Sequence, residues 1–429
     1  LPIFSDGTGK IAQGTLTKRG EGKLVLNLDN TGWNGDISVQ QGELVAQVAN
    51  SLGSGAITVT DGVLTLATAD VQPGMGMINL QGGSLNLASG SFATAFTADN
   101  MTWTGGSVTL GEEVAATVAK ALANGKAVEL ADGSVLRVSG ANDNSALNLN
   151  ASGSGTVSVG LGTSYGANVL NMSTEFQGIL SVTSGYFQLN NVTMGADGIL
   201  KLADSNVRTE WNGTAGGTFA NDVVFTGNQV FATKDFTFSG DLSGTAFSTQ
   251  GAGNITLAGG VNLDGQLKVH RGTVTVNSAD VAKLGDSIDI QNNSTLAFAR
   301  DFSYGGVISG TAGSTVSVNA GTLELTGANT FLGALSIAGG ATARLGDGSA
   351  WAGSLSGAGS LVIDTAGEIT LAAGNTGFTG STTLSGTGTV TLEGADSLGS
   401  GRVTVNNGVL NLSSLDAANV ILITKGSLD

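Results

Sequence analysis

The chain has 429 residues, of which 69 are Gly, only 2 are Pro and none is Cys, and its formal net charge is −16. With 41% hydrophobic residues it is too apolar for a disordered Gly/Ser linker. The lack of Cys excludes disulfides and thiolate chemistry, and the acidic balance opposes non-specific binding to nucleic acid or to anionic membranes.

A Gly-x-Φ-x-Φ pattern, in which Φ is usually Leu, Val or Ile, returns along the chain about every 20 residues. It occurs at Gly22, Gly42, Gly62, Gly83 and Gly106, and later at Gly272, Gly388 and Gly408. Alternation with period two indicates a strand with one buried face. The period leaves no room for a crossover helix and is too short for a propeller blade. It predicts a parallel β-helix, in which short strands stack about 4.8 Å apart and the inserted loops are short.

The same pattern assigns the two faces of each strand. The first Φ is predicted to point inward and to form one ladder, made of Leu24, Leu44, Leu64, Leu85, Val108, Val157, Phe187, Leu200, Val274, Leu323, Leu361, Val390 and Leu410. The residue between the two Φ positions is predicted to face solvent from one long, flat, polar face. The candidate self-association residues on that face are Thr65, Asn86, Thr109, Gln188, Thr256, Thr275 and Asn411.

Two segments depart from the repeat. Residues 111–130 place Val114, Val118 and Leu122 at helical spacing and have Asn124-Gly125 as a stop signal, which predicts a short inserted helix. Residues 205–250 are rich in Phe, with Trp211 beside them. They are interpreted as a stack of core aromatics, with a substrate-stacking aromatic platform as the alternative.

The repeats resemble a known family. Residues 321–341, GTLELTGANTFLGALSIAGGA, are similar to the passenger-associated repeat of bacterial autotransporters, as are residues 53–66, GSGAITVTDGVLTL, and 397–412, SLGSGRVTVNNGVLNL. The resemblance implies an all-β, right-handed parallel β-helix over residues 1–429, strongest in the C-terminal rungs at 305–429. It also implies display on a Gram-negative surface, or secretion, through an outer-membrane barrel that is not in this chain. Relatives without a protease domain are mostly self-associating adhesins.

The sequence offers little for catalysis. Its one histidine, His270, would have to serve any Ser-His-Asp triad. The Gly-x-Ser-x-Gly match at residues 162–166 lies in a Gly-rich loop, and Gly285-Asp286-Ser287 is followed by Ile288 rather than Gly. Acidic residues are scattered at turns, as at Asp61, Asp132, Asp197 and Asp347, rather than clustered. We therefore expect no enzyme activity, no cofactor and no metal site, with a polysaccharide-degrading β-helix enzyme as an alternative.

Two classes of binding partner remain. In the first, identical chains on neighbouring cells pair through the polar face, producing adhesion, aggregation and biofilm. In the second, a host matrix protein or sulfated glycan binds in a loop-bordered groove. The candidate ligand-binding residues for the second class are the basic series Lys201, Arg208, Lys234, Lys268, Arg271 and Arg300, with Trp211 and His270 nearby. The competing interpretation of this series is scattered, solvated charge.

Overall fold

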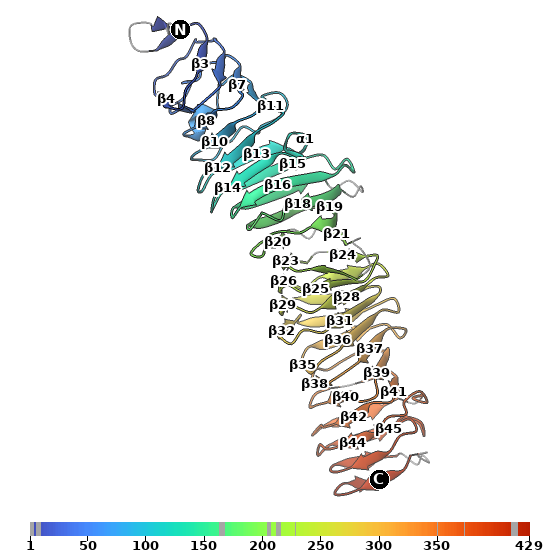
Figure 1. The fold of residues 1–429 in the computed structure, drawn as a ribbon. Coiled ribbons are helices and arrows are strands. Elements are labelled where there is room, and N and C mark those ends of the chain that lie inside the picture. The colour runs from blue at the N-terminus through green and yellow to red at the C-terminus, as the bar shows by residue number, and fades with distance from the viewer. Residues whose placement is uncertain are drawn as a thin grey trace. The chain divides into compact units, whose positions relative to one another are not determined.

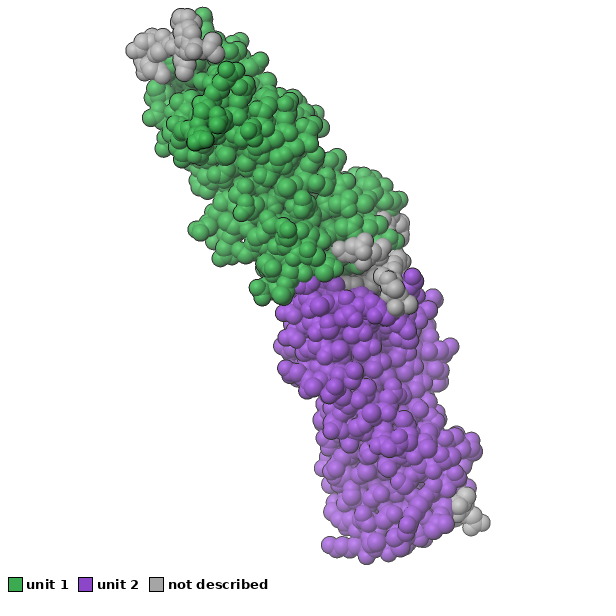
Figure 2. Space-filling view, in the orientation of Figure 1, with its two compact units in different colours: residues 1–208 green, residues 209–429 purple. Residues whose placement is uncertain are grey.

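A computed structural model describes residues 4–5, 10–162, 168–203, 207–211, 216–227, 229–349, 351–372, 374–412 and 419–429. The chain divides into two compact units, Leu1–Arg208 and Thr209–Asp429, coloured separately in Figure 2. Both units are built from short strands that pair in parallel with the strand one turn earlier and the strand one turn later (Figure 1). We call each turn a rung. The predicted parallel β-solenoid is confirmed in both units.

Unit 1 begins with an antiparallel pair and continues as parallel sheets. The pair is β1 (Phe4–Ser5) and β2 (Ile11–Gln13). Sheet 1a contains β3 (Leu16–Lys18), β5 (Ile37–Val39), β7 (Ile57–Val59), β9 (Ile78–Leu80) and β11 (Met101–Trp103). Sheet 1b contains β4 (Lys23–Leu26), β6 (Glu43–Ala46), β8 (Val63–Leu66), β10 (Ser84–Leu87), β12 (Ser107–Leu110), β14 (Ala127–Leu130) and β16 (Leu147–Gly153).

The later rungs of unit 1 form two more sheets. Sheet 1c contains β13 (Ala115–Ala119), β15 (Val135–Gly140), β17 (Thr156–Leu161), the first half of β19 (Ile179–Val192) and β20 (Ile199–Leu202). Sheet 1d joins the start of β16, β18 (Asn168–Met172) and the second half of β19. A 3-10 turn, η1 (Ala69–Val71), lies between β8 and β9, and β21 (Val207–Trp211) spans the division between the units.

Unit 2 starts with three sheets. Sheet 2a contains β23 (Asp222–Thr226), β26 (Leu242–Thr245), β29 (Val261–Asp264) and β32 (Val281–Leu284). Sheet 2b contains β24 (Gln229–Ala232), β27 (Ser248–Gln250), β30 (Gln266–Val269), β33 (Ser287–Ile290) and β36 (Val307–Gly310). Sheet 2c contains β22 (Gly217–Phe219), β25 (Phe236–Phe238), β28 (Asn254–Leu257), β31 (Thr273–Val276), β34 (Thr295–Phe298), β37 (Thr315–Val318), β39 (Ala334–Ile337) and β41 (Leu355–Gly357).

Two sheets complete unit 2 at its C-terminal end. Sheet 2d contains β35 (Phe302–Tyr304), β38 (Thr322–Leu325), β40 (Thr342–Leu345), β42 (Ser360–Ile363), β44 (Thr382–Leu384), β46 (Val403–Val405) and β48 (Ile421–Ile423). Sheet 2e contains β43 (Glu368–Leu371), β45 (Thr389–Leu392), β47 (Val409–Asn411) and β49 (Ser427–Leu428). The described residues from 305 onward are therefore built of rungs.

The core consists of the predicted inward residues. All of them are buried except Leu24, which is half-buried in the first rung of sheet 1b. The prediction that they form one ladder is wrong, because Leu64 lies on sheet 1b, Val157 on 1c, Val274 on 2c, Leu361 on 2d and Val390 on 2e. Each rung has two or three strands and the same Gly-x-Φ-x-Φ motif occurs on more than one of them, so the motif does not identify the sheet.

The predicted helix at residues 111–130 is mostly strand. Only α1 (Lys120–Ala123) is helical, and it is a single turn. The residues before it form β13, paired with β15, and those after it form β14, paired with β12 and β16. Val114, Ala116 and Val118 are all buried, so period two describes the segment. The segment is a rung that carries one helical turn at its corner.

The Phe-rich segment forms a core stack, as interpreted from the sequence. Phe225 and Phe247 are fully buried with ring centroids 4.6 Å apart, and the ring of Phe238 lies edge-on to Phe225 at 6.2 Å. Phe219 is 5% exposed and Phe236 is half-buried. The side chains of Trp211 and Phe231 lie outside the described residues, as do residues 212–215.

An Asn-Thr pair followed closely by an aromatic residue recurs in the sequence, as in Asn329-Thr330-Phe331 and Asn375-Thr376-Gly377-Phe378, and this phrase forms a corner of the solenoid. At Asn329 the side-chain Oδ1 accepts a hydrogen bond from the backbone N–H of Ile308, one rung earlier, at 2.8 Å. At Asn375 the amide bonds the backbone of Leu355 one rung earlier and of Ser397 one rung later. The aromatic residue of each copy is buried, as are Phe331 and Phe378. The Asn side chain of this phrase thus forms hydrogen bonds with backbone N–H and C=O groups inside the turn, so the role of the phrase is structural.

Glycine occupies corners where consecutive rungs leave no room for a side chain. A Cβ placed on Gly380 would lie 1.7 Å from the carbonyl oxygen of Gly359, and one on Gly401 would lie 1.6 Å from that of Gly380. At these positions the reason for glycine is the close approach of backbone to backbone. In contrast, a Cβ on Gly339 would meet no heavy atom within 4 Å.

We expect Gly380→Ala to lower the free energy of unfolding by about 1–3 kcal/mol, because the new methyl group forces adjacent rungs apart. Gly339→Ala is the matched control in the same unit and should leave stability nearly unchanged. Urea denaturation followed by circular dichroism measures both. Equal stability of the two variants would contradict the steric explanation.

Candidate functional site

The seven candidate self-association residues lie on four different sheets. In unit 1, Thr65, Asn86 and Thr109 follow one another in register on sheet 1b, whereas Gln188 lies on β19 in sheet 1d. In unit 2, Thr256 and Thr275 are neighbours on sheet 2c and Asn411 lies on sheet 2e. The structure therefore brings together two groups from this set, one in each unit, and does not produce one continuous face.

Thr65 differs from the sequence expectation of a solvent-facing residue. It is 5% exposed, and its hydroxyl donates a hydrogen bond of 2.7 Å to Oε1 of Glu43 in the preceding rung. Glu43 also forms an ion pair with Lys23, in which Nζ of Lys23 lies 2.9 Å from Oε2 of Glu43. Burial alone would raise the pKa of Glu43, but the bonds from Lys23 and Thr65 hold that pKa below its usual range. The hydroxyl of Thr65 is therefore already bonded to the carboxylate of the Lys23–Glu43 ion pair.

The basic series is distributed over several faces and corners. In unit 1, Lys201 is exposed on the outer side of sheet 1c. Arg208 and Trp211 are on β21, but their side chains lie outside the described residues. In unit 2, Lys268 is half-buried on sheet 2b, with Ser248 beside it on one strand and Asp289 on the other.

The remaining basic residues of unit 2 border sheet 2c. Lys234 precedes β25, and His270 and Arg271 precede β31, so all three lie at the corner where the chain passes from sheet 2b to 2c. Arg300 follows β34 at the opposite end of these strands, where its Nε donates a hydrogen bond of 3.2 Å to Asn277. Only Lys234, His270 and Arg271 of the predicted series share a corner.

Carboxylates at the corners link consecutive rungs. Oδ1 of Asp222 accepts a hydrogen bond of 2.8 Å from the backbone N–H of Asp241, and Oδ1 of Asp241 accepts one of 2.7 Å from that of Gly260. Asp301 bonds Thr322 in the same way at 2.7 Å. These separations of 19 and 21 residues equal one rung. Some of the scattered acidic residues of the sequence, Asp347 among them, are thus used by the backbone of the next turn.

Sequence reasoning missed a buried cation in unit 1. Lys120 in α1 is 6% exposed, and its Nζ donates to Oδ1 of Asp143 at 2.5 Å, to Oδ1 of Asn168 at 2.7 Å and to the carbonyl of Ser145 at 3.3 Å. These bonds use all three protons of the ammonium group. The hydrogen bond from Lys120, together with those from Ser145, holds the pKa of Asp143 well below its usual range. The cluster anchors the loop after β15 to α1 and β18.

A second cluster in unit 2 surrounds Lys283. Its Nζ lies 2.6 Å from Oδ1 of Asp264 and 2.7 Å from Oδ1 of Asp286, and these contacts raise the pKa of Lys283 and lower that of Asp286. The Gly285-Asp286-Ser287 segment is therefore the turn that carries this ion pair. Nearby Tyr304 donates a hydrogen bond of 3.3 Å to the carbonyl of Gly285, and burial raises the pKa of Tyr304 to about 12.

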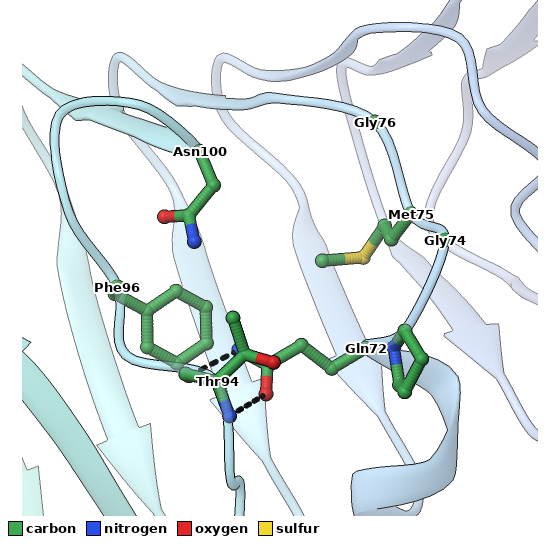
Figure 3. Close-up of a pocket in the computed structure, with 8 residues that line it drawn as sticks. Gln72, Gly74, Met75, Gly76, Thr94, Phe96 and Asn100 are labelled. Atoms are coloured by element: carbon green, nitrogen blue, oxygen red, sulfur yellow. Dashed lines mark hydrogen bonds between the residues drawn. The ribbon is translucent and has the colours of Figure 1, made fainter.

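A small pocket of about 170 Å³ lies beside η1 in unit 1. Figure 3 shows Met75, Phe96 and Asn100 turned toward its interior. The amide of Gln72 both donates to the carbonyl of Thr94 at 2.8 Å and accepts from its N–H at 3.2 Å, and Asn100 donates to the carbonyl of Ala95 at 2.8 Å. These amides hold the loop that forms the pocket wall.

Residues 163–167, which contain most of the Gly-x-Ser-x-Gly match, lie outside the described residues. In the part of the chain that is described, no three His, Asp or Glu side chains gather closely enough to hold a metal ion. Over the same residues, no helix is both long and apolar enough to cross a membrane.

Comparison of the chain with protein-family models, with curated proteins and with solved structures gave no match. The fold and the arrangement of its outward side chains are therefore the basis for the functional proposal.

We expect the chain to lose stability in acid because the folded state depresses the pKa of Asp29, Asp143 and Asp286. A carboxyl group with a depressed folded pKa stabilises the fold above its unfolded pKa, near 3.8, and this contribution disappears as pH falls through the folded pKa. The melting temperature should stay level between about pH 7 and pH 5 and fall below about pH 4.

The Asp143→Asn variant removes the contribution of Asp143 to the pH dependence of stability and leaves those of Asp29 and Asp286 in place. It retains the shape of the side chain but cannot ionise, so its melting temperature should be lower than that of the parent at neutral pH and should change less between about pH 5 and pH 3. Thermal melts at matched ionic strength measure both properties. An identical acid dependence of parent and variant would show that the Lys120 cluster does not contribute.

Proposed function

We propose that the chain is the surface-exposed passenger of an autotransporter-like adhesin, and that it acts by binding rather than by catalysis. The observation that carries the proposal is the set of outward columns in which Thr, Ser and Asn recur at the same position of consecutive strands. Asn86 and Thr109 form such a column on sheet 1b, and Thr256 and Thr275 form another on sheet 2c. The sequence resemblance to passenger repeats supports the same assignment.

Repeated columns favour adhesion because many weak contacts act together. An exposed hydroxyl or amide contributes at most about one net hydrogen bond's free energy, roughly 0.5–1.5 kcal/mol. When several such groups are held at a fixed rung spacing, their combined affinity exceeds that of any one of them, because the first contact raises the effective concentration of the others. Identical chains on neighbouring cells have the same spacing, so self-association leading to aggregation and biofilm is the form of adhesion that we propose first.

Display of the chain on a bacterial surface tests the proposal. Cells carrying the parent chain should clump, and one of three face-specific double variants should reduce clumping by about tenfold, because added carboxylates repel each other across an acidic interface. The variants are Asn86→Asp with Thr109→Asp, Thr256→Asp with Thr275→Asp, and Thr383→Asp with Thr404→Asp. The last two residues are outward neighbours on sheet 2d. Settling rate and microscopy provide the measurement, with matched surface expression as the control.

Two results would count against self-association. If the parent cells remain dispersed but bind immobilised matrix protein, the partner is a host molecule. If the parent neither clumps nor adheres, the adhesive function itself is wrong. Clumping that persists in all three variants would place the contact on another face.

A second candidate function is binding of a sulfated host glycan, which the shared corner of Lys234, His270 and Arg271 favours. We expect Lys234→Ala with Arg271→Ala to weaken heparin binding by roughly fivefold and to lower the salt needed for elution, because exposed cations contribute at most ~1 kcal/mol each and are screened by salt. Lys201→Ala, an exposed lysine of unit 1, is the control. Unchanged elution of the double variant would exclude this corner.

A further inference from the structure

The outer face of sheet 2c carries two columns of small uncharged side chains. The first column runs in register through Asn254, Thr273, Thr295, Thr315 and Ala334. The second lies two residues further along each strand and includes Thr256, Thr275, Ala297, Ser317 and Ser336. It continues to Thr218 at one end of the sheet and to Ser356 at the other. Both columns alternate with buried residues along their strands, except at β34, where Ala297 of the second column is itself buried.

This absence of charge distinguishes sheet 2c from the other sheets of unit 2. Over the described residues, each of those sheets has a charged side chain in an outward column. The charged residues are Lys283 on 2a, Lys268 and Asp289 on 2b, Glu324 and Arg344 on 2d, and Glu368 on 2e. An outward face without charge on a chain of net charge −16 favours a partner that is itself uncharged.

Five threonine hydroxyls of sheet 2c are also unused, whereas the hydroxyl of Ser317 donates a hydrogen bond of 2.7 Å to Oδ1 of Asn319. Within the described part of the chain, the side chains of Thr256, Thr273, Thr275, Thr295 and Thr315 make no hydrogen bond. The situation differs on sheet 1b, where Thr65 bonds Glu43, and on sheet 2e, where Thr391 bonds Glu368. Each free hydroxyl offers one donor and two acceptor positions to a ligand.

The dimensions of the face suit one polymer chain better than a second protein. The sheet has eight strands, so the second column extends over about 34 Å, the first column over about 19 Å, and the two columns lie about 7 Å apart. The strip covers at most on the order of 240 Å², whereas a stable protein interface covers about 800 Å² on each partner. A narrow strip with regularly spaced hydroxyls matches an extended ligand whose own hydroxyls repeat along its length.

We propose that the outward face of sheet 2c binds a single extended chain of an uncharged polysaccharide, which lies across the strands along the stacking direction. The inference rests on the proposed adhesive function and names its ligand class. Hydroxyl groups of successive sugars exchange hydrogen bonds with the threonines of successive rungs, and no charge on either partner has to be desolvated. Sulfated glycans would instead depend on the cations that border the sheet.

The test uses the purified chain and immobilised uncharged glycans, namely amorphous cellulose, chitin, β-1,3-glucan and dextran. The quadruple variant Thr256→Val, Thr273→Val, Thr275→Val and Thr315→Val removes four hydroxyls while retaining β-branched shape. We expect the parent to bind at least one glycan and the quadruple variant to bind it about tenfold or more weakly. The control variant Thr17→Val, Thr58→Val, Thr322→Val and Thr342→Val alters outward threonines of sheets 1a and 2d and should bind like the parent.

Several outcomes would overturn the inference. They are failure of the parent to bind any of the four glycans, equal binding by the parent and the sheet 2c variant, and binding to heparin alone. Concentration-dependent sedimentation that is lost only in the sheet 2c variant would identify a second copy as the occupant. Matched melting temperatures establish that the variants are folded. If displayed cells still clump or adhere to matrix while glycan binding is absent, the adhesive function stands and only this ligand class is wrong.

Discussion

The structure depends on hydrogen bonding between backbones that are one rung apart. Each strand bonds a strand about 20 residues earlier and another about 20 residues later, as Thr275 does with Thr256 and Ala297. This requires every corner to return the chain to the same place. Glycine at Gly380, asparagine at Asn375 and aspartate at Asp241 serve that requirement by allowing close approach or by bonding the backbone of an adjacent rung. Asparagines and aspartates at the corners of the rungs therefore have a structural role.

Inward and outward positions consequently have separate roles. Inward residues such as Val274 fill the core and contact the rungs on both sides, so their identity is restricted by packing. Outward residues need only fit a pleated surface, which leaves them available for recognition. In unit 2 the outward columns carry charge on most sheets, as at Glu324 on sheet 2d. On sheet 2c they are uncharged, as at Thr256.

Much of the fold could be predicted from the sequence because period two and glycine spacing report local geometry directly. The buried state of Leu64 or Leu410 needs no knowledge of distant residues. The predicted helix failed because positions four apart, such as Val114 and Val118, fit both a helix and an alternating strand. The Lys120 cluster was beyond sequence reasoning, since its partners are 23 and 48 residues away. The position of a face also depends on how many strands each rung contains, which the motif does not encode.

The pairing of each rung with its immediate neighbours has an evolutionary consequence. Because neighbouring rungs supply nearly all of a strand's partners, a whole rung inserted or deleted would leave every other rung with an equivalent neighbour. Loss of a single residue inside a strand such as β31 would instead shift inward residues outward. Genes for such chains can therefore lengthen or shorten by duplication of complete turns, and the number of binding positions on a face changes in proportion without redesign of the core.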